Sequence, residues 1–211
     1  MPKPTSEDLA EALKTSRGLV SAEARGVAAV EDLVETAEFR TFLGILLDTD
    51  GKVITSAAGT SGAVARRLAH LLSVCGTPAL YLHPTEGLHG SLGAVAPGDI
   101  VIALSKGGGT GELTEFAARA KARGARILVM TSRNQSPLSE VADDVAIIPA
   151  GEGDPGGAIA MGSTLAMASW GDALAISLMQ LRGYTWEQFL FTHPAGKVGE
   201  DAEEILSRVG N

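Results

Sequence analysis

Residues 99–124 read DIVIALSKGGGTGELTEFAARAKARG, and this stretch decides the fold that we expect. Its first part, 101–104, is a short apolar run typical of a buried parallel strand. Its last part carries apolar residues at helical spacing and stops at Gly124, which predicts an amphipathic helix. The glycine-rich loop 105–111 lies between the two. A strand, a glycine loop and a helix in this order predict an α/β domain.

The glycine-rich loop suits an anion. Glycines leave backbone N–H groups unobstructed, and the start of the helix directs the positive end of its dipole towards the loop. Lys106 adds a positive charge, and Ser105 and Thr110 add hydroxyl donors. The alternative is a flexible turn that binds nothing. We favour phosphate binding, because all three donors stand beside the glycines.

The spacing of the loop excludes common nucleotide motifs. A Walker A loop needs Gly-Lys-Ser/Thr directly before the helix, whereas Gly111 is followed by Glu112. A dinucleotide fingerprint that begins at Gly107 and Gly109 needs a third glycine where this glutamate stands. A Gly-x-Ser-x-Gly elbow is absent too, because residues 59–63 read GTSGA. We therefore expect a small phosphorylated ligand rather than a nucleotide.

Further strands and helices alternate with this unit. We expect the other strands at 52–56, 77–82, 126–131 and 145–148. We expect helices at 63–74, near 137–142, at 161–181 and at 185–191, with a glycine-rich loop at 150–160. This alternation predicts a doubly wound, five-stranded, mainly parallel sheet flanked by helices on both faces.

The first 48 residues form a separate helical extension. Their apolar residues recur at three- and four-residue steps, with a break near Gly18. They contain no group of residues that suggests catalysis or ligand binding. We therefore expect 1–48 to pack on the domain or on a partner subunit, and 49–211 to form the ligand-binding domain.

Composition excludes several classes of function. A net charge of −8 and an aromatic content of 4% argue against a nucleic-acid surface. The longest apolar runs fall far short of the roughly 18 residues that span a bilayer, so we expect no membrane segment. The single cysteine, Cys75, cannot form an internal disulfide, which favours a reducing cytoplasm.

The spacing of His83, Glu86 and His89 invites a metal site. Three-residue steps drift around a helix, and a proline and two glycines interrupt the segment. We therefore expect no metal there.

Ligands of doubly wound sheets bind beyond the carboxyl ends of the strands. Four loops are expected around one crevice, namely 56–62, 83–89, 105–112 and 131–134. Two parts of them, 59–62 and 105–110, have the small polar composition of phosphate loops.

With these loops in place, the chain resembles the sugar isomerase (SIS) domain family, and within it the arabinose-5-phosphate isomerase branch. The resemblance rests on GTSG at 59–62, HPTEGLHG at 83–90, Asp99 to Ser105, GDAL at 171–174 and HPAG at 193–196. It implies the doubly wound SIS fold, a sugar phosphate as ligand, and homodimers or homotetramers with shared sites. The pair of CBS domains that often follows this domain is expected to be absent.

The family resemblance implies aldose–ketose isomerisation through an enediol, run by side chains without a metal or cofactor. It assigns proton transfer to Glu112, Glu152 and His193. It assigns phosphate binding to the hydroxyl groups of Ser61, Ser105 and Thr110, and it makes His89 a further residue that lines the site. From the composition of the two loops we add Gly59, Thr60 and Lys106 as expected phosphate or substrate contacts. From the residues alone, Glu112 could equally complement the dipole of its helix, Glu152 could be a solvated charge, and His193 could merely close the last helix. Asp172 could cap a neighbouring helix or line the site.

Two departures from the family pattern concern charge. The first loop normally reads Gly-Lys-Ser-Gly, and here Thr60 replaces the lysine. The second normally reads Ser-Asn-Ser-Gly-Glu-Thr/Ser, and here it reads SKGGGT, with a lysine gained at 106. Our hypothesis is that Lys106 supplies the cation missing at Thr60. A non-catalytic phosphosugar sensor and an isomerase of another sugar phosphate stay open as alternatives.

Overall fold

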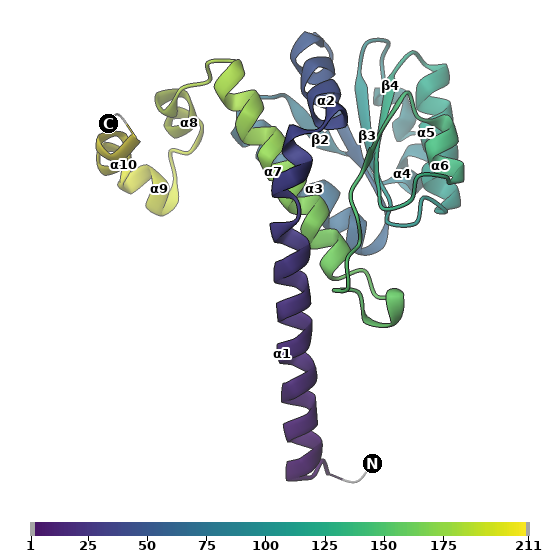
Figure 1. Cartoon of the computed structure of the whole chain (residues 1–211). Coiled ribbons are helices and arrows are strands. Elements are labelled where there is room, and N and C mark those ends of the chain that lie inside the picture. The colour runs from purple at the N-terminus through teal and green to yellow at the C-terminus, as the bar shows by residue number, and fades with distance from the viewer. Residues whose placement is uncertain (1–2, 210–211) are drawn as a thin grey trace.

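A computed structural model describes residues 3–209, and its centre is a five-stranded sheet (Figure 1). The strands are β1 (Val53–Ser56), β2 (Ala79–Tyr81), β3 (Ile100–Leu104), β4 (Arg126–Thr131) and β5 (Asp144–Ile147). Their order is β2-β1-β3-β4-β5, and every neighbouring pair is parallel. The predicted doubly wound sheet is confirmed, and its strand ends differ from the predicted ones by at most two residues.

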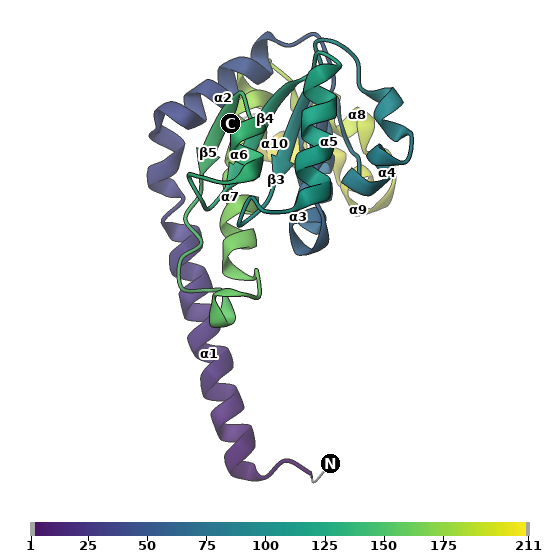
Figure 2. The same cartoon turned by 90° about the vertical axis from the view of Figure 1, so that its right-hand side faces the viewer.

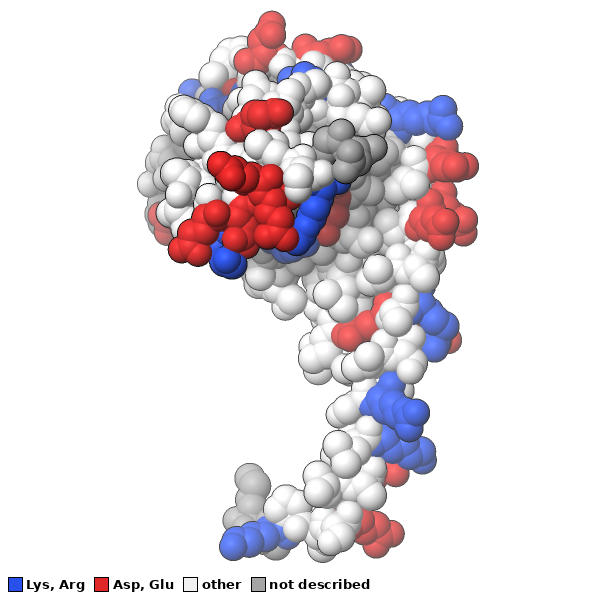
Figure 3. Space-filling view, turned by 90° about the vertical axis from the view of Figure 1, so that its left-hand side faces the viewer, with Lys and Arg blue, Asp and Glu red and all other residues white. Residues whose placement is uncertain are grey.

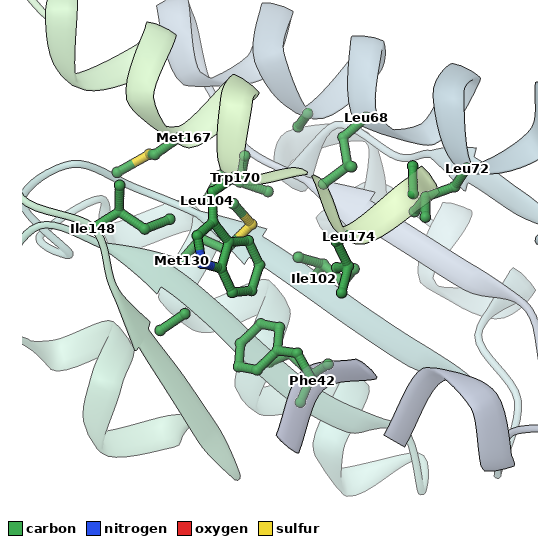
Figure 4. Close-up of a cluster of buried hydrophobic side chains, with 14 of the residues drawn as sticks. Phe42, Leu68, Leu72, Ile102, Leu104, Met130, Ile148, Met167, Trp170 and Leu174 are labelled. Carbon is green, nitrogen blue, oxygen red and sulfur yellow. The ribbon is translucent and has the colours of Figure 1, made fainter. Parts of the chain in front are cut away.

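Three helices cover the first face of the sheet: α2 (Ala37–Asp48), α3 (Gly59–Val74) and α7 (Gly162–Leu181). Trp170 of α7 lies at the centre of this core, in edge-to-face contact with Phe39 and Phe42, with ring centroids 5.1 and 5.2 Å apart (Figure 4). Ile102 and Leu104 of β3 point to the same core. Successive residues of a strand point to opposite faces, which is why alternate residues of β3 serve this side.

The second face is covered by α4 (Pro84–Leu88), α5 (Gly111–Ala122) and α6 (Pro137–Val141), which stand in front of the sheet in Figure 2. Val101 and Ala103 of β3 pack here against Phe116 of α5, and all three side chains are fully buried. Both faces of β3 are therefore apolar, which explains the continuous apolar run at 101–104.

The helix α1 (Ser6–Ala28) projects away from the domain (Figure 1). It begins in a capping box between Thr5 and Asp8 and runs through Gly18 without interruption. The expected break near Gly18 is wrong. The chain turns only after Ala28, before the 3₁₀ helix η1 (Glu31–Glu35), because one exposed glycine costs a helix only about 1 kcal/mol.

The rest of the chain is helical or irregular. The helices α8 (Trp186–Thr192), α9 (Gly196–Glu200) and α10 (Ala202–Val209) follow α7, and the sequence pattern predicted only the first of them. Short 3₁₀ helices η2 (Ser91–Ala94) and η3 (Pro155–Gly157) lie in loops. The predicted segments 1–48 and 49–211 each extend two residues beyond the described range. Within residues 3–209, no helix combines the length and the apolar character that crossing a membrane requires.

Candidate functional site at the carboxyl ends of the strands

The sheet reverses its winding between β1 and β3. These two strands are neighbours, with Ser56 of β1 level with Ala103 of β3. The chain leaves β1 for α3 on the first face and leaves β3 for α5 on the second face. In the strand order found here, the crevice between such diverging loops is where ligands bind. The structure therefore places the two predicted phosphate loops on either side of one switch point.

The loop after β3, residues 105–110, is held in a tight curve by its own hydroxyl groups; we call it the phosphate loop. Ser105 Oγ accepts a hydrogen bond from Gly108 N at 3.1 Å and lies 3.3 Å from Thr110 Oγ1. Gly108 has a φ of +66°, and a Cβ there would lie 2.0 Å from Ser136 Oγ. The loop therefore needs glycine at this position.

The helices that leave the switch point begin with free N–H groups. The N-cap residues Ala58 of α3 and Thr110 of α5 make no side-chain cap hydrogen bond. Uncapped helix starts present unsatisfied donors and a positive dipole end to an anion. α3 begins at Gly59 rather than at the predicted residue 63, so Thr60 and Ser61 lie in its first turn. The sequence pattern misses this first turn because glycine, threonine and serine are frequent in loops.

Tyr81 supports the turn before α3. Its hydroxyl donates to the carbonyl oxygen of Ala57 at 2.8 Å, and the Arg66 guanidinium lies 4.3 Å from the centre of its ring. Burial raises the pKa of Tyr81 above its ordinary value, and Arg66 opposes this shift only in part. The phenol therefore stays a hydrogen-bond donor at neutral pH. Sequence reasoning missed this role, because a tyrosine on an edge strand carries no signal for it.

Lys106 extends from the phosphate loop to the loop 150–160. Its Nζ lies 2.6 Å from Asp154 Oδ2 and donates to the carbonyl oxygen of Gly157 at 2.7 Å. Lys106 and Thr60 line two different cavities. The lysine gained at 106 thus has a carboxylate partner that sequence reasoning did not anticipate.

Asp154 also holds the start of α7. Its Oδ1 accepts from Met161 N at 2.9 Å and from Ser163 N at 3.0 Å. Burial by itself raises the pKa of Asp154, but the hydrogen bonds from Lys106, Ser163 and Met161 outweigh it and leave the pKa below its ordinary value. The buried carboxyl group is therefore ionised at neutral pH. Sequence reasoning did not find this role, because Asp154 binds N–H groups seven and nine residues further along the chain and no local pattern indicates such contacts.

The two candidate glutamates lie at separate places and are both exposed. Glu112 occupies the first turn of α5, directly after the phosphate loop. Glu152 lies in the loop before α7, where its Oε2 meets the Arg25 guanidinium of α1 at 3.0 Å. The structure therefore brings Glu112 to the switch point and turns Glu152 towards α1.

His193 ends α8, which lies across α7 from α5 (Figure 1). Its ring stacks on Phe189 with centroids 4.2 Å apart, and its Nδ1 lies 2.9 Å from the Phe189 carbonyl oxygen. A carbonyl only accepts, so Nδ1 carries the proton and Nε2 of the neutral ring is left as an acceptor. Within one chain, the structure does not bring His193 together with Glu112.

The remaining candidates have local partners. His83 caps α4 by accepting the Thr85 N–H at Nδ1, and the exposed His89 ends the same helix. Asp172 forms an ion pair with Arg67 of α3, with Nη2 and Oδ2 2.8 Å apart. Residues 3–209 contain no group of three His, Cys, Asp or Glu side chains arranged to hold a metal ion.

Two cavities adjoin these elements. The first, of about 380 Å³, lies between the phosphate loop, Ser132 and Arg133 after β4, and the loop before α7; we call it the loop cavity. The second, of about 470 Å³, lies between α1, α3 and α7, and its lining surface is mainly apolar; we call it the α1 groove. The loop cavity joins the carboxyl ends of the strands, so it is the better candidate for a small polar ligand.

The chain is similar in sequence to known proteins. Residues 45–177 match the family model described as SIS domain. The chain is 36% identical over 162 residues to the arabinose 5-phosphate isomerase KdsD of Shigella flexneri, covering 76% of this chain and 48% of that protein. It is 37% identical over 163 residues to the arabinose 5-phosphate isomerase GutQ of Salmonella typhimurium, covering 77% and 51%. The chain thus spans about half the length of the curated relatives it matches.

The chain is also similar in structure to a solved protein. The protein c3406 of E. coli CFT073, solved in complex with arabinose 5-phosphate, superimposes with a TM-score of 0.79 at 31% sequence identity. The match covers 90% of this chain and all of that one.

Proposed function

The chain belongs to the SIS domain family, and from this premise we propose that it is a phosphosugar aldose–ketose isomerase that acts through an enediol. One observation carries the proposal: two uncapped helix starts and a hydroxyl-lined glycine loop meet at the switch point of the sheet. This arrangement suits the dianionic phosphate of a small sugar.

The phosphate is held at the switch point. The first turns of α3 and α5 supply N–H groups, and Ser61, Ser105 and Thr110 supply hydroxyl groups. Gly59 and Thr60 contribute through the backbone of the first turn of α3. The sugar chain then extends into the loop cavity, whose volume of about 380 Å³ lies within the range of small-ligand pockets.

The reaction needs a base that removes a proton from the carbon beside the carbonyl and returns it to the neighbouring carbon. Glu112 and Glu152 are the carboxylates of this proposal. Glu112 lies in the first turn of α5, after the phosphate loop, and Glu152 belongs to the loop whose residues Gly151 and Asp154 line the loop cavity. His193 moves protons between the sugar oxygens, for which its acceptor Nε2 is suited. In this proposal His89, at the end of α4, is a further substrate contact. No metal or other cofactor is part of this scheme.

A second copy of the chain completes the site. Within one chain α8, which ends at His193, lies across α7 from α5, so in this proposal the histidine serves the site of a neighbouring subunit (Figure 1). The helix α1 supports this arrangement. Its side chains Leu9, Leu13, Val20 and Val27 form a stripe at helical spacing; all four are exposed, and we call them the α1 stripe.

The α1 stripe runs into the α1 groove, because Val27 lines that groove. Most charged side chains of α1 gather along another edge of the helix (Figure 3). An exposed apolar stripe on a projecting helix marks a surface for association. We therefore infer a homodimer or homotetramer in which α1 contacts another subunit.

The substrate proposed first is arabinose 5-phosphate, with ribulose 5-phosphate as product. The named activity of the KdsD and GutQ relatives and the arabinose 5-phosphate bound to c3406 support this choice. We place the protein in the cytoplasm, where such phosphorylated sugars and the unpaired Cys75 are both expected.

Incorporation of solvent deuterium tests the activity. The protein is incubated with arabinose 5-phosphate in heavy water, and we expect deuterium at the carbon beside the carbonyl. Glu112→Gln and Glu152→Gln should each reduce this incorporation at least tenfold. The matched control is Glu115→Gln, an exposed glutamate of α5 paired with Arg119, which should leave it unchanged. Absence of incorporation in the unmodified protein contradicts the proposal.

Thr60 favours a second function, a phosphosugar sensor without catalysis, because the family lysine is missing there. Tight binding of the sugar phosphate without deuterium incorporation supports this function. An isomerase of another sugar phosphate shares the mechanism and is recognised by a panel of pentose, hexulose and tetrose phosphates in the same assay.

A further inference from the structure

An ion pair links the phosphate loop to the loop before α7. Lys106 Nζ lies 2.6 Å from Asp154 Oδ2, and the two side chains are 23% and 3% exposed. Lys106 also donates to the Gly157 carbonyl oxygen at 2.7 Å. One ammonium group on the phosphate loop thus makes two contacts to a loop that lies about fifty residues further along the chain.

The Asp154 carboxylate connects three elements. Its Oδ1 accepts the Met161 and Ser163 N–H groups at the start of α7, while its Oδ2 meets Lys106. A carboxylate this deeply buried is costly without a cationic partner. Loss of the lysine would therefore disturb both the loop and its attachment to α7.

Glu152 lies next to these contacts in the loop before α7. Gly153 packs directly on Gly162, where a Cβ at residue 153 would lie 2.9 Å from the Gly162 Cα, and Gly162 N donates to the Gly153 carbonyl oxygen at 3.0 Å. Glu152 immediately precedes this contact, and Asp154 immediately follows it. The position of the Glu152 backbone is thus set by the contacts of its two successors.

We propose that Asp154 is a positioning residue which, through Lys106, aligns the loop carrying Glu152 with the phosphate loop. The proposal rests on the proposed isomerase function for its kinetic consequence. In this proposal Lys106 links the two loops and is not a ligand of the phosphate, because the buried Asp154 carboxylate already neutralises its charge. The phosphate is then bound by N–H and hydroxyl groups.

The test compares Lys106→Met, Asp154→Asn and the double variant with the unmodified full-length chain. The control is Lys121→Met, which removes another lysine–aspartate pair, with Nζ of Lys121 2.8 Å from Asp143 Oδ1. We expect hydrogen exchange of the amides of 150–160 to be at least tenfold faster in both single variants. The double variant should be no faster than either, and the control should match the unmodified chain.

Two further measurements separate positioning from phosphate binding. The Kd of inorganic phosphate, measured by calorimetry, should change less than threefold in Lys106→Met. With a sugar phosphate that the protein isomerises, kcat should fall at least tenfold while KM changes less than threefold.

Unchanged exchange in Lys106→Met, or a loss of phosphate affinity of tenfold or more, overturns the proposal. Should Asp154→Asn fail to fold, Lys106→Met decides by itself. If the unmodified protein isomerises no sugar phosphate, the proposed function fails, while exchange and phosphate binding still decide the role of Asp154.

Discussion

Ser105 Oγ lies 3.3 Å from Thr110 Oγ1, so the first and last residues of the phosphate loop are joined across its curve. The same Ser105 oxygen accepts the Gly108 N–H. One hydroxyl group therefore both shapes the loop and stands where the proposed phosphate binds. The contact explains why a loop with so many glycines keeps a defined form.

Replacement of Ser105 by alanine should weaken phosphate binding. A hydrogen bond to a charged group contributes roughly 1.5–3 kcal/mol, so the Kd of inorganic phosphate should rise about 10- to 150-fold. Calorimetric titration measures it. Ser73→Ala removes a hydroxyl at the other end of α3, where Ser73 donates to the Ala79 carbonyl oxygen, and should leave the affinity unchanged. Equal affinity in both variants would remove Ser105 from the site.

Two neighbouring glycines should respond differently to alanine. Gly108 has a positive φ, and its added Cβ would meet Ser136, so Gly108→Ala should destabilise the protein by about 1–3 kcal/mol. Gly107 has no heavy atom within 4 Å of the same added atom, so Gly107→Ala should change stability by less than about 0.5 kcal/mol. Urea unfolding followed by circular dichroism gives both values, and similar losses would contradict the described loop.

Tyr81→Phe should loosen the turn before α3. The hydroxyl group donates to the Ala57 carbonyl oxygen, and its loss should cost about 1 kcal/mol of stability and raise KM for the sugar phosphate severalfold. Tyr184→Phe removes a similar bond, to the Gln188 carbonyl oxygen at 3.2 Å, at an exposed place far from the switch point. Its KM should stay the same. A matching rise in both variants would mean that the effect is not local.

Stability should fall in acid through Asp99. Burial by itself raises the pKa of Asp99, but hydrogen bonds from the Lys52 ammonium, 2.5 Å away, and from the Ala96 and Lys52 N–H groups outweigh it and lower the pKa below its ordinary value of 3.8. Because the folded pKa lies below the unfolded one, the stabilisation is complete well above pH 4 and disappears as the pH falls through the folded pKa.

Two variants check this assignment, namely Asp99→Asn and, as the control, Asp50→Asn. Asp50 is exposed and lies in the turn before β1. Asp99→Asn should lower the free energy of unfolding by about 1–3 kcal/mol at pH 7 and flatten its decline between pH 5 and pH 3. Asp50→Asn should keep the decline of the unmodified protein. Urea unfolding at several pH values gives the curves, and parallel curves for all three proteins would exclude Asp99 as the cause.

Charges placed on the α1 stripe should dissociate the proposed oligomer. Leu13 and Val20 are apolar and 62% and 63% exposed, and the double variant Leu13→Glu, Val20→Glu replaces both with charged side chains. Sedimentation velocity should show the mass of one chain for this variant and a multiple of it for the unmodified protein. Arg17→Glu lies outside the stripe and should keep the larger mass. A monomeric unmodified protein would contradict the shared site.

Much of the fold could be predicted from residues 99–124. A buried run, a glycine loop and an amphipathic helix are local patterns, and the structure confirms them as β3, the loop 105–110 and α5. Helix boundaries were less certain. The sequence pattern predicts the start of α3 four residues late and a break near Gly18, whereas glycine weakens a helix without ending it.

Local patterns predict the types of most elements, the parallel sheet and the small polar loops, because periodicity and glycine content act over a few residues. Tertiary packing is what brings Lys106 to Asp154 and Tyr81 to Ala57, and what sets α8, which ends at His193, across α7 from α5. These contacts join residues far apart in the chain. Their partners are chosen by strand order and helix packing, which no local pattern records.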